Sequence, residues 1–232
     1  MLEKPANLII ICGHYGSGKT NIAVNLAIRM REMYPEKKIY AADLDIVNPY
    51  FRTADAADLL REEGIEPLIP EFANTNVDIP TLPPKLYQLL EGKNEDEIAI
   101  IDVGGDDGSV ALGMYRKLIQ AHPYEMLYVI NYYRPLTEDP ADCFGCMLEI
   151  EASSGLKCTG IVNNSNLGAE TTGDLITDSV EYAKKCAEVC SLPLLCHTYC
   201  PEYAPDTPEK MEEAGYGSEV LSAIRNATKK LF

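Results

Sequence analysis

The sequence predicts an α/β fold of three layers, in which a mostly parallel sheet of about seven strands lies between layers of helices. Short apolar runs alternate with amphipathic stretches over nearly all of the 232 residues. This alternation is the pattern of βα units whose strands are buried on both faces. A glycine-rich loop stands between the first apolar run and the first amphipathic stretch. The length fits one domain, residues 1–232.

Seven short apolar runs are the predicted strands, and an amphipathic stretch follows each. In chain order the strands are expected at 8–12, 38–42, 67–69, 97–102, 126–130, 158–162 and 193–197. The helices are expected at 19–33, 52–63, 83–91, 110–121, 140–153, 174–190 and 218–231. Pro80, Pro83 and Pro84 exclude a continuous helix or a central strand from the segment 71–84. The last helix is expected to pack on the sheet rather than on a membrane.

The charge balance limits the partners of the chain. There are 20 Lys and Arg residues against 36 Asp and Glu residues, a formal net charge of −16. Nucleic acid phosphates and anionic lipid repel such a chain, and no basic cluster opposes this, so neither nucleic acid nor membrane is expected as a partner. No apolar run reaches the roughly 18 residues of a membrane helix. The first run leads into a glycine-rich loop rather than a cleavage site, so a cytoplasmic location is expected.

Residues 13–20, directly after the first strand, match the Walker A pattern G-x-x-x-x-G-K-[ST]. This segment is called the phosphate loop. Its N–H groups and the dipole of the helix that follows suit phosphate oxygens. Lys19 is expected to reach the β and γ phosphates, and the Thr20 hydroxyl to bind Mg²⁺. A chance match in a glycine-rich turn is the alternative, but the strand before it and the helix after it favour a nucleotide site. The predicted nucleotide-binding residues here are Gly13, His14, Tyr15, Gly16, Ser17, Gly18, Lys19, Thr20 and Asn21.

Acidic residues follow the second and fourth predicted strands. Asp43 and Asp45 lie after the second, and Asp102-Val-Gly-Gly105 after the fourth has the D-x-x-G spacing of a γ-phosphate sensor. The carboxyl ends of parallel strands meet at one edge of a sheet, so these groups are expected beside the phosphate loop. Asp43 and Asp102 are predicted to hold Mg²⁺ with Thr20. Asp45 is predicted to orient the attacking water and Gly105 to donate its N–H to the γ-phosphate. Carboxylates that only cap strand ends are the alternative.

Together these motifs resemble the ParA/MinD group of P-loop ATPases, whose wider class includes the nitrogenase iron protein, the carbon monoxide dehydrogenase maturation ATPases and the CbiA/CobQ amidases. The resemblance covers nearly the whole chain and extends to Gly160-Ile-Val-Asn163-Asn164-Ser165 on the sixth strand. It implies a P-loop NTPase fold, ATP and Mg²⁺ as cofactors, and a homodimer. It also implies an asparagine that pairs with adenine, for which Asn164 is the better match. A role as turn formers is the alternative for these two asparagines.

The phosphate loop departs from the pattern of that group at one place. The signature lysine of the group stands second in the loop and reaches the nucleotide of a partner subunit, whereas this chain has His14 there, followed by Tyr15. Because histidine is mostly neutral near pH 7, it cannot act as a permanent cation. Arg52 is the candidate that supplies the charge instead. Asn131, at the end of the fifth strand, is expected at the rim of the nucleotide site.

The eight cysteines are expected to be free thiols or metal ligands. Cys143 and Cys146 lie three residues apart on a predicted helix, so both thiols can face one ion. Two such pairs from two subunits would form a Cys₄ site for Zn²⁺ or another soft metal. The alternative is that the thiols pack in the core, where cysteine is commonly found.

These observations favour a Mg²⁺-dependent ATPase that works as a conformational switch. Its output is expected on a partner protein, such as a metalloenzyme or a corrinoid protein in maturation or activation. The alternative is a small-molecule ligase or kinase of the dethiobiotin-synthetase or CbiA type, with a substrate pocket around Asn74, Asn76 and Asp78. A third interpretation is a binding module that does not hydrolyse nucleotide, in which Asp45 would have no role.

Overall fold

In the computed structural model, residues 5–44, 56–68, 84–91 and 94–227 are described, except for the side chains of residues 105–107 and 219. Within them, eight parallel strands form one sheet in the order β3-β2-β4-β1-β5-β6-β7-β8. The predicted α/β class and three-layer arrangement are confirmed, with one strand more than expected. The strands are β1 (Leu8–Cys12), β2 (Lys38–Asp43), β3 (Glu66–Leu68), β4 (Glu97–Asp102), β5 (Glu125–Ile130), β6 (Gly160–Asn163), β7 (Leu194–Tyr199) and β8 (Leu221–Ala223).

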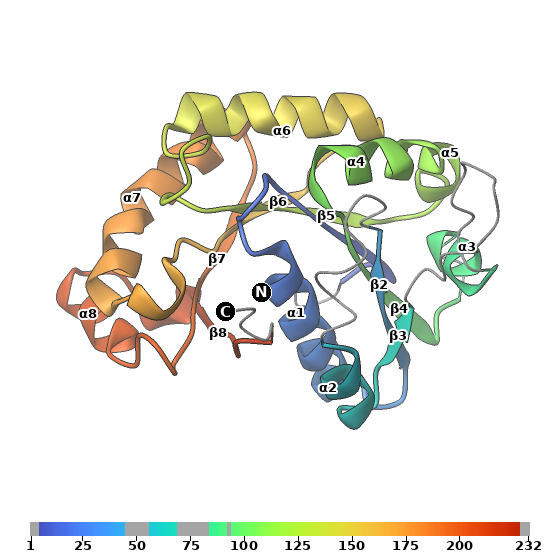
Figure 1. Ribbon diagram of the computed structural model, residues 1–232, viewed down its shortest axis with the longest axis horizontal. Coiled ribbons are helices and arrows are strands. Elements are labelled where there is room, and N and C mark those ends of the chain that lie inside the picture. The colour runs from blue at the N-terminus through green and yellow to red at the C-terminus, as the bar shows by residue number, and fades with distance from the viewer. Residues whose placement is uncertain (1–4, 45–55, 69–83, 92–93, 228–232) are drawn as a thin grey trace.

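Helices cover both faces of this sheet (Figure 1). Helix α1 (Lys19–Met33) and α2 (Ala57–Glu62) share one apolar cluster with strand residues such as Ile9 and Ile11. The neighbouring residues Leu8, Ile10 and Cys12 face the opposite cluster, because successive strand side chains alternate between the two faces. The helices on that second face are α3 (Pro84–Leu90), α4 (Gly105–Gly113), α5 (Arg116–Ile119), α6 (Pro140–Ser154) and α7 (Gly173–Cys190).

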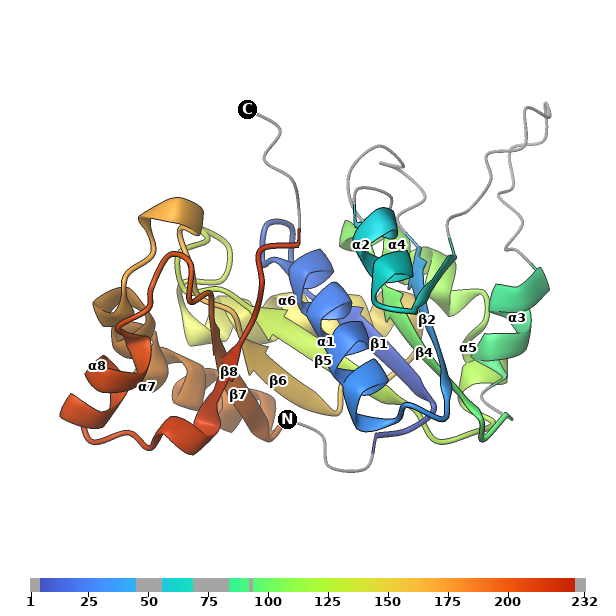
Figure 2. The ribbon, with the colours of Figure 1, turned by 90° about the horizontal axis from the view of Figure 1, so that it is seen from below.

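The central strand β1 determines where a ligand would bind. The chain runs outward from β1 through β2 and β3, returns to β4 beside β1, and then continues on the other side with β5. Ligands of open parallel sheets bind beyond the carboxyl ends of the strands at such a reversal of strand order. In Figure 2 the turn from β1 into α1 lies at that edge of the sheet.

The predicted C-terminal helix, 218–231, is wrong for its described part. Ser218–Val220 is a single 3₁₀ turn, and Leu221–Ala223 is strand β8, which pairs with β7. The pairing covers the edge that β7 would otherwise leave open, and Ile224 and Ala227 are buried against α1. The burial of apolar side chains and the pairing with β7 therefore determine the structure of this segment, although its apolar residues recur with a helical spacing. Residues 228–231 lie outside the described part of the chain.

The observed helices differ from the prediction at two further places. The expected helix 110–121 is two helices, α4 and α5, because α4 begins earlier and ends at Gly113, where a Cβ would lie 2.6 Å from the Ser153 carbonyl oxygen of α6. Helix α8 (Thr207–Glu213) was not predicted. The sequence contains two signals for the start of this helix that the prediction did not use: Pro208 in its first turn and the preceding Asp206. Among the described helices, none combines the length and the apolarity needed to cross a lipid bilayer.

Candidate functional site

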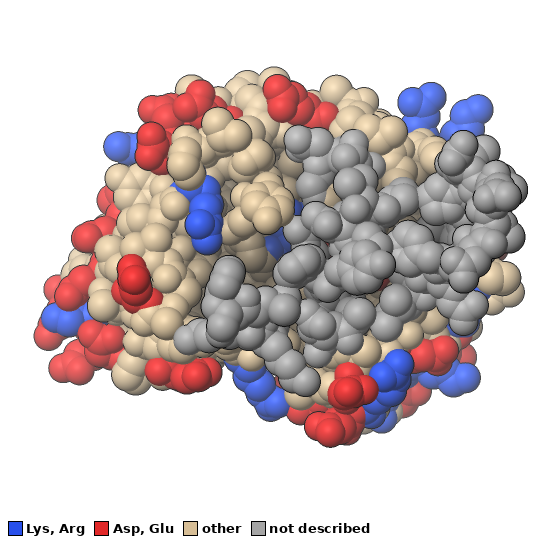
Figure 3. Space-filling model, viewed as in Figure 1, with Lys and Arg blue, Asp and Glu red and all other residues tan. Residues whose placement is uncertain are grey.

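The phosphate loop joins the buried strand β1 to the N-terminus of α1, as predicted. Gly18 is the residue before the helix and has a left-handed backbone, with φ +86°. A Cβ there would lie 2.3 Å from Nδ2 of Asn164. Both its φ and this close approach therefore require glycine. Figure 3 shows a hollow near the middle of this side of the molecule, with basic side chains at and inside its rim.

The side chains of the phosphate loop differ in burial and in hydrogen bonding. Lys19 is 4% exposed, and its ammonium donates to the His14 carbonyl oxygen at 3.1 Å. The Ser17 hydroxyl is buried and has no hydrogen-bond partner within the described residues. A buried hydroxyl without a partner is unusual and fits a loop that takes up a polar ligand. Tyr15 is 67% exposed.

The residues predicted to hold Mg²⁺ lie together at the end of the sheet. The Thr20 hydroxyl donates to Oδ2 of Asp102 at 2.6 Å. Asp43 ends β2 in register with Asp102 at the end of β4, and both are buried. Two adjacent carboxylates and a hydroxyl are oxygen ligands of the kind that Mg²⁺ prefers. Within the described chain, no group of three or more His, Cys, Asp or Glu side chains is arranged to hold a metal ion.

Some predicted site residues cannot be placed. Asp45, Arg52 and the proposed substrate pocket around Asn74, Asn76 and Asp78 lie outside the described residues. Gly105 is described by its backbone alone: it is the first residue of α4, where the N–H groups have no partner inside the helix. This position suits the predicted γ-phosphate contact, which remains a prediction.

Asn164 lies against the phosphate loop rather than open to a ligand. Its Nδ2 donates to the Ser17 carbonyl oxygen at 2.7 Å, and its Oδ1 accepts from the Thr198 hydroxyl at 2.6 Å. The side chain is 3% exposed. Because both ends of the amide are engaged, the arrangement assigns Asn164 to anchoring the loop. Each end of the amide keeps a second hydrogen-bonding position, and the pairing of Asn164 with adenine stays a prediction.

Behind Asn164, a buried polar network joins β6 to β7 and α7. Nδ2 of Asn163 bonds to the Ser179 hydroxyl at 2.9 Å and to Nδ1 of His197 at 2.8 Å. Burial, with a smaller effect from Lys184, lowers the pKa of His197 to about 4. His197 is therefore neutral at pH 7, and Nδ1 accepts while Nε2 carries the proton. This network fixes the strand ends from which Asn164 reaches the loop.

Two further predicted residues have structural partners. Asn131 is fully buried, and its amide binds the Tyr133 N–H and the Asn166 carbonyl oxygen, so it shapes the turn after β5. Oδ1 of Asn21 accepts from the Ala227 N–H at 3.0 Å and ties the C-terminal segment to α1. The turn after β5 also carries Arg134, which sequence reasoning did not single out. Nε of Arg134 donates to the Gly16 carbonyl oxygen at 3.0 Å.

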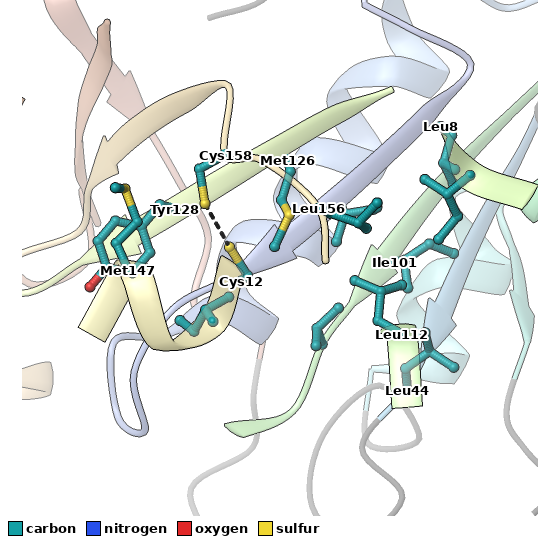
Figure 4. Packing of buried hydrophobic residues seen from close by; sticks show 14 of the residues in the cluster. Leu8, Cys12, Leu44, Ile101, Leu112, Met126, Tyr128, Met147, Leu156 and Cys158 are labelled. Carbon is teal, nitrogen blue, oxygen red and sulfur yellow. Dashed lines mark hydrogen bonds between the residues drawn. The ribbon is translucent and has the colours of Figure 1, made fainter. Parts of the chain in front are cut away.

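The predicted metal pair Cys143 and Cys146 has two different surroundings. Cys143 is fully buried, and hydrogen bonding to the Cys186 and Cys190 thiols lowers its pKa. The Cys146 thiol is partly exposed and donates to the Leu136 carbonyl oxygen at 3.5 Å. The same core contains Cys12 and Cys158, whose sulfurs are 3.8 Å apart (Figure 4). A site shared between subunits would require Cys143 to leave this core, so the arrangement favours packed thiols.

We expect Cys143→Ser to lower the free energy of unfolding by about 1–3 kcal/mol, because it places a hydroxyl in an apolar core. Cys146→Ser, which has access to water, should change it by less than about 0.5 kcal/mol. Chemical denaturation measures both values. Metal analysis of protein purified without oxygen is the control. One metal ion per two chains, lost when both residues are serine, would instead support the shared Cys₄ site.

Comparison with known proteins supports the fold. No family model and no curated protein matches the sequence. Among solved structures, chloroplast FtsY from Physcomitrella patens matches with a TM-score of 0.54 and 15% identity over 85% of this chain. The signal recognition particle 54 kDa protein from Aeropyrum pernix K1, in complex with GDP, matches with a TM-score of 0.50 and 18% identity, also over 85%. This chain spans 59% and 42% of those two chains.

At these identities the similarity establishes the fold alone, which is that of P-loop NTPases. FtsY and the 54 kDa protein belong to the signal recognition particle branch. That branch differs from the ParA/MinD group that the motifs resemble. Membership of the ParA/MinD group is therefore not established by these structures.

Proposed function

We propose that this protein is a Mg²⁺-dependent ATP-binding and ATP-hydrolysing switch of the ParA/MinD type, acting as a homodimer in the cytoplasm. The observation that carries this proposal is the 2.6 Å hydrogen bond between Thr20 and Asp102, directly beside Lys19 of the phosphate loop. A hydroxyl from the loop and a carboxylate from the neighbouring strand are the two groups that P-loop proteins use to hold Mg²⁺. The GDP bound to the Aeropyrum pernix protein of similar fold supports a nucleotide as the ligand.

The switch would operate through the segment that follows Asp102. Asp102 ends β4, and Val103 and Gly104 lead into α4 at Gly105. When bound, Mg²⁺ supplies positive charge at the phosphates. Thr20 and Asp102 would hold the cation, and the first N–H groups of α4 would donate to the γ-phosphate. A contact there would bias the position of α4 according to the state of the nucleotide, which is how such switches signal to a partner.

The partner that we propose is a protein, with a metalloenzyme or a corrinoid protein as the leading class. The net charge of −16 opposes nucleic acid and anionic membranes. The competing proposal, a small-molecule ligase or kinase, depends on residues 71–83, which lie outside the described part. Steady-state ATPase assays separate these two functions and a binding module that does not hydrolyse nucleotide. Stimulation of a slow basal rate by a protein fraction supports the switch, and stimulation by a small metabolite supports the ligase or kinase. Tight nucleotide binding without turnover supports a binding module.

We expect ATP to bind at least about tenfold more tightly than GTP. Guanine is read in P-loop proteins by a carboxylate that accepts from two guanine N–H groups. After β6 the chain reads Asn164-Ser-Asn-Leu-Gly-Ala, and no carboxylate occurs before Glu170. The expectation does not depend on Asn164, which is engaged with the loop. Competition against a fluorescent ATP analogue measures the ratio. GTP binding equal to or tighter than ATP binding would assign the protein to guanine nucleotides.

A further inference from the structure

We propose that Arg134 is a second phosphate-binding cation of the phosphate loop, presented by the same chain from the turn after β5. The proposal rests on the nucleotide function above and adds a residue that no part of the Walker A pattern contains. The decisive contact is the hydrogen bond from Nε of Arg134 to the Gly16 carbonyl oxygen at 3.0 Å. It joins two segments that are 118 residues apart in the sequence.

The guanidinium lies directly against the loop. A Cβ added to Gly16 would lie 3.2 Å from Nε and 3.6 Å from Cζ of Arg134. Gly16 has φ +78°, so its conformation also favours glycine. The absence of a side chain at Gly16 leaves the space in which the arginine packs. The loop and the arginine therefore form one surface.

The backbone that carries Arg134 is fixed by buried hydrogen bonds. The Arg134 N–H donates to the Asn131 carbonyl oxygen, and the Thr137 N–H donates to the Arg134 carbonyl oxygen at 2.9 Å. The Thr137 hydroxyl closes the turn on the Asn131 carbonyl oxygen at 2.8 Å. Asn131 and Thr137 are both buried. The hydroxyl of Tyr182, on α7, also bonds to the Thr137 carbonyl oxygen. A cation on such a support loses little entropy when an anion binds.

The charge of Arg134 has no acidic partner in the described residues. No ion pair joins it to a described Asp or Glu, although the chain as a whole carries −16. Nε is used by Gly16, and the Nη1 and Nη2 groups have no hydrogen-bond partner in the described chain. Guanidinium groups bind phosphate through two such donors. The chemistry of the site therefore fits the phosphate chain of a nucleotide.

Arg134 could hold the loop or bind phosphate, and two substitutions that differ in charge distinguish these roles. Arg134→Lys keeps the cation but loses the planar pair of donors, and Arg134→Gln removes the charge. Inorganic triphosphate is the probe, because it carries the phosphates without a base. We expect Arg134→Gln to weaken its binding, measured by calorimetry with Mg²⁺, by about 10- to 100-fold. The change in log Kd for triphosphate caused by Arg134→Lys should be less than about a third of the change caused by Arg134→Gln.

Arg29→Gln is the matched control. Arg29 is an exposed arginine of α1 that lines the cavity between this helix and the C-terminal segment. It is ten positions beyond Lys19, about 15 Å along the helix, so its charge should not matter. Triphosphate binding by Arg29→Gln should equal that of the wild type.

Three results would overturn the proposal. If Arg134→Gln binds triphosphate like the wild type, the arginine does not contact phosphate. If Arg134→Lys and Arg134→Gln lose the same affinity, Arg134 only positions the loop through Gly16. If Arg29→Gln loses as much as Arg134→Gln, the effect reflects overall charge. Absence of binding by the wild type would instead reject the proposed nucleotide function itself, and so the two failures are distinguishable.

Discussion

Lys19→Ala is expected to abolish ATP hydrolysis and to weaken Mg²⁺–ATP binding by about 100-fold or more. Lys19 is the first residue of α1 and is 4% exposed, with its ammonium 3.1 Å from the His14 carbonyl oxygen. A buried cation at this place stabilises negative charge on the phosphates much more than a solvated one would. Alanine keeps the helix, so the change removes the charge and the hydrogen bond from the ammonium to the His14 carbonyl oxygen.

Binding by calorimetry and turnover by phosphate release measure the two effects of Lys19→Ala. Lys117→Ala on α5 is the control, because it removes an exposed lysine from a helix on the other face of the sheet. We expect this control to behave like the wild type. Normal turnover by Lys19→Ala would show that the nucleotide site lies elsewhere in the molecule.

The central part of the fold could be predicted from sequence because its signals are local. The bounds predicted for β1, α1 and β4 agree with the observed Leu8–Cys12, Lys19–Met33 and Glu97–Asp102. Each strand is a short apolar run that ends at a polar or glycine residue, and α1 begins where the glycine-rich loop ends. The meeting of Thr20 and Asp102 also follows from the sequence, because parallel strands end at one edge.

The errors arise where distant segments decide the structure. The spacing of apolar residues in 218–231 predicted a helix, but it could not show that β7 has an open edge. Leu221–Ala223 pairs with β7 at that edge. The same holds in the site: the bonds from Asn164 to Ser17 and from Arg134 to Gly16 join residues 147 and 118 positions apart. No local pattern marks such a contact. A motif predicts which loop binds phosphate, but it does not predict which side chains from distant segments hold that loop.

Asp102→Asn is expected to reduce ATP hydrolysis by about 100-fold or more and to raise the Mg²⁺ concentration needed for half-maximal activity. Asp102 is 2% exposed and lies in register with Asp43. Its Oδ2 accepts a hydrogen bond from the Thr20 hydroxyl at 2.6 Å. The amide has the same shape and can still accept from Thr20, so the free energy of unfolding of the ligand-free protein should change by less than about 1 kcal/mol. What the variant loses is one of two adjacent negative charges that would attract the cation.

A Mg²⁺ titration of activity and a denaturation curve test the two halves of this expectation. Thr20→Val removes the other partner of the same hydrogen bond, and its Mg²⁺ dependence should shift in the same direction. Asp58→Asn is the control, because Asp58 is an exposed carboxylate on α2 that pairs with Arg61. It should leave the titration unchanged. If Asp102→Asn kept the wild-type Mg²⁺ dependence, the cation would be held without Asp102. The bond to Thr20 would then serve only to connect α1 to β4.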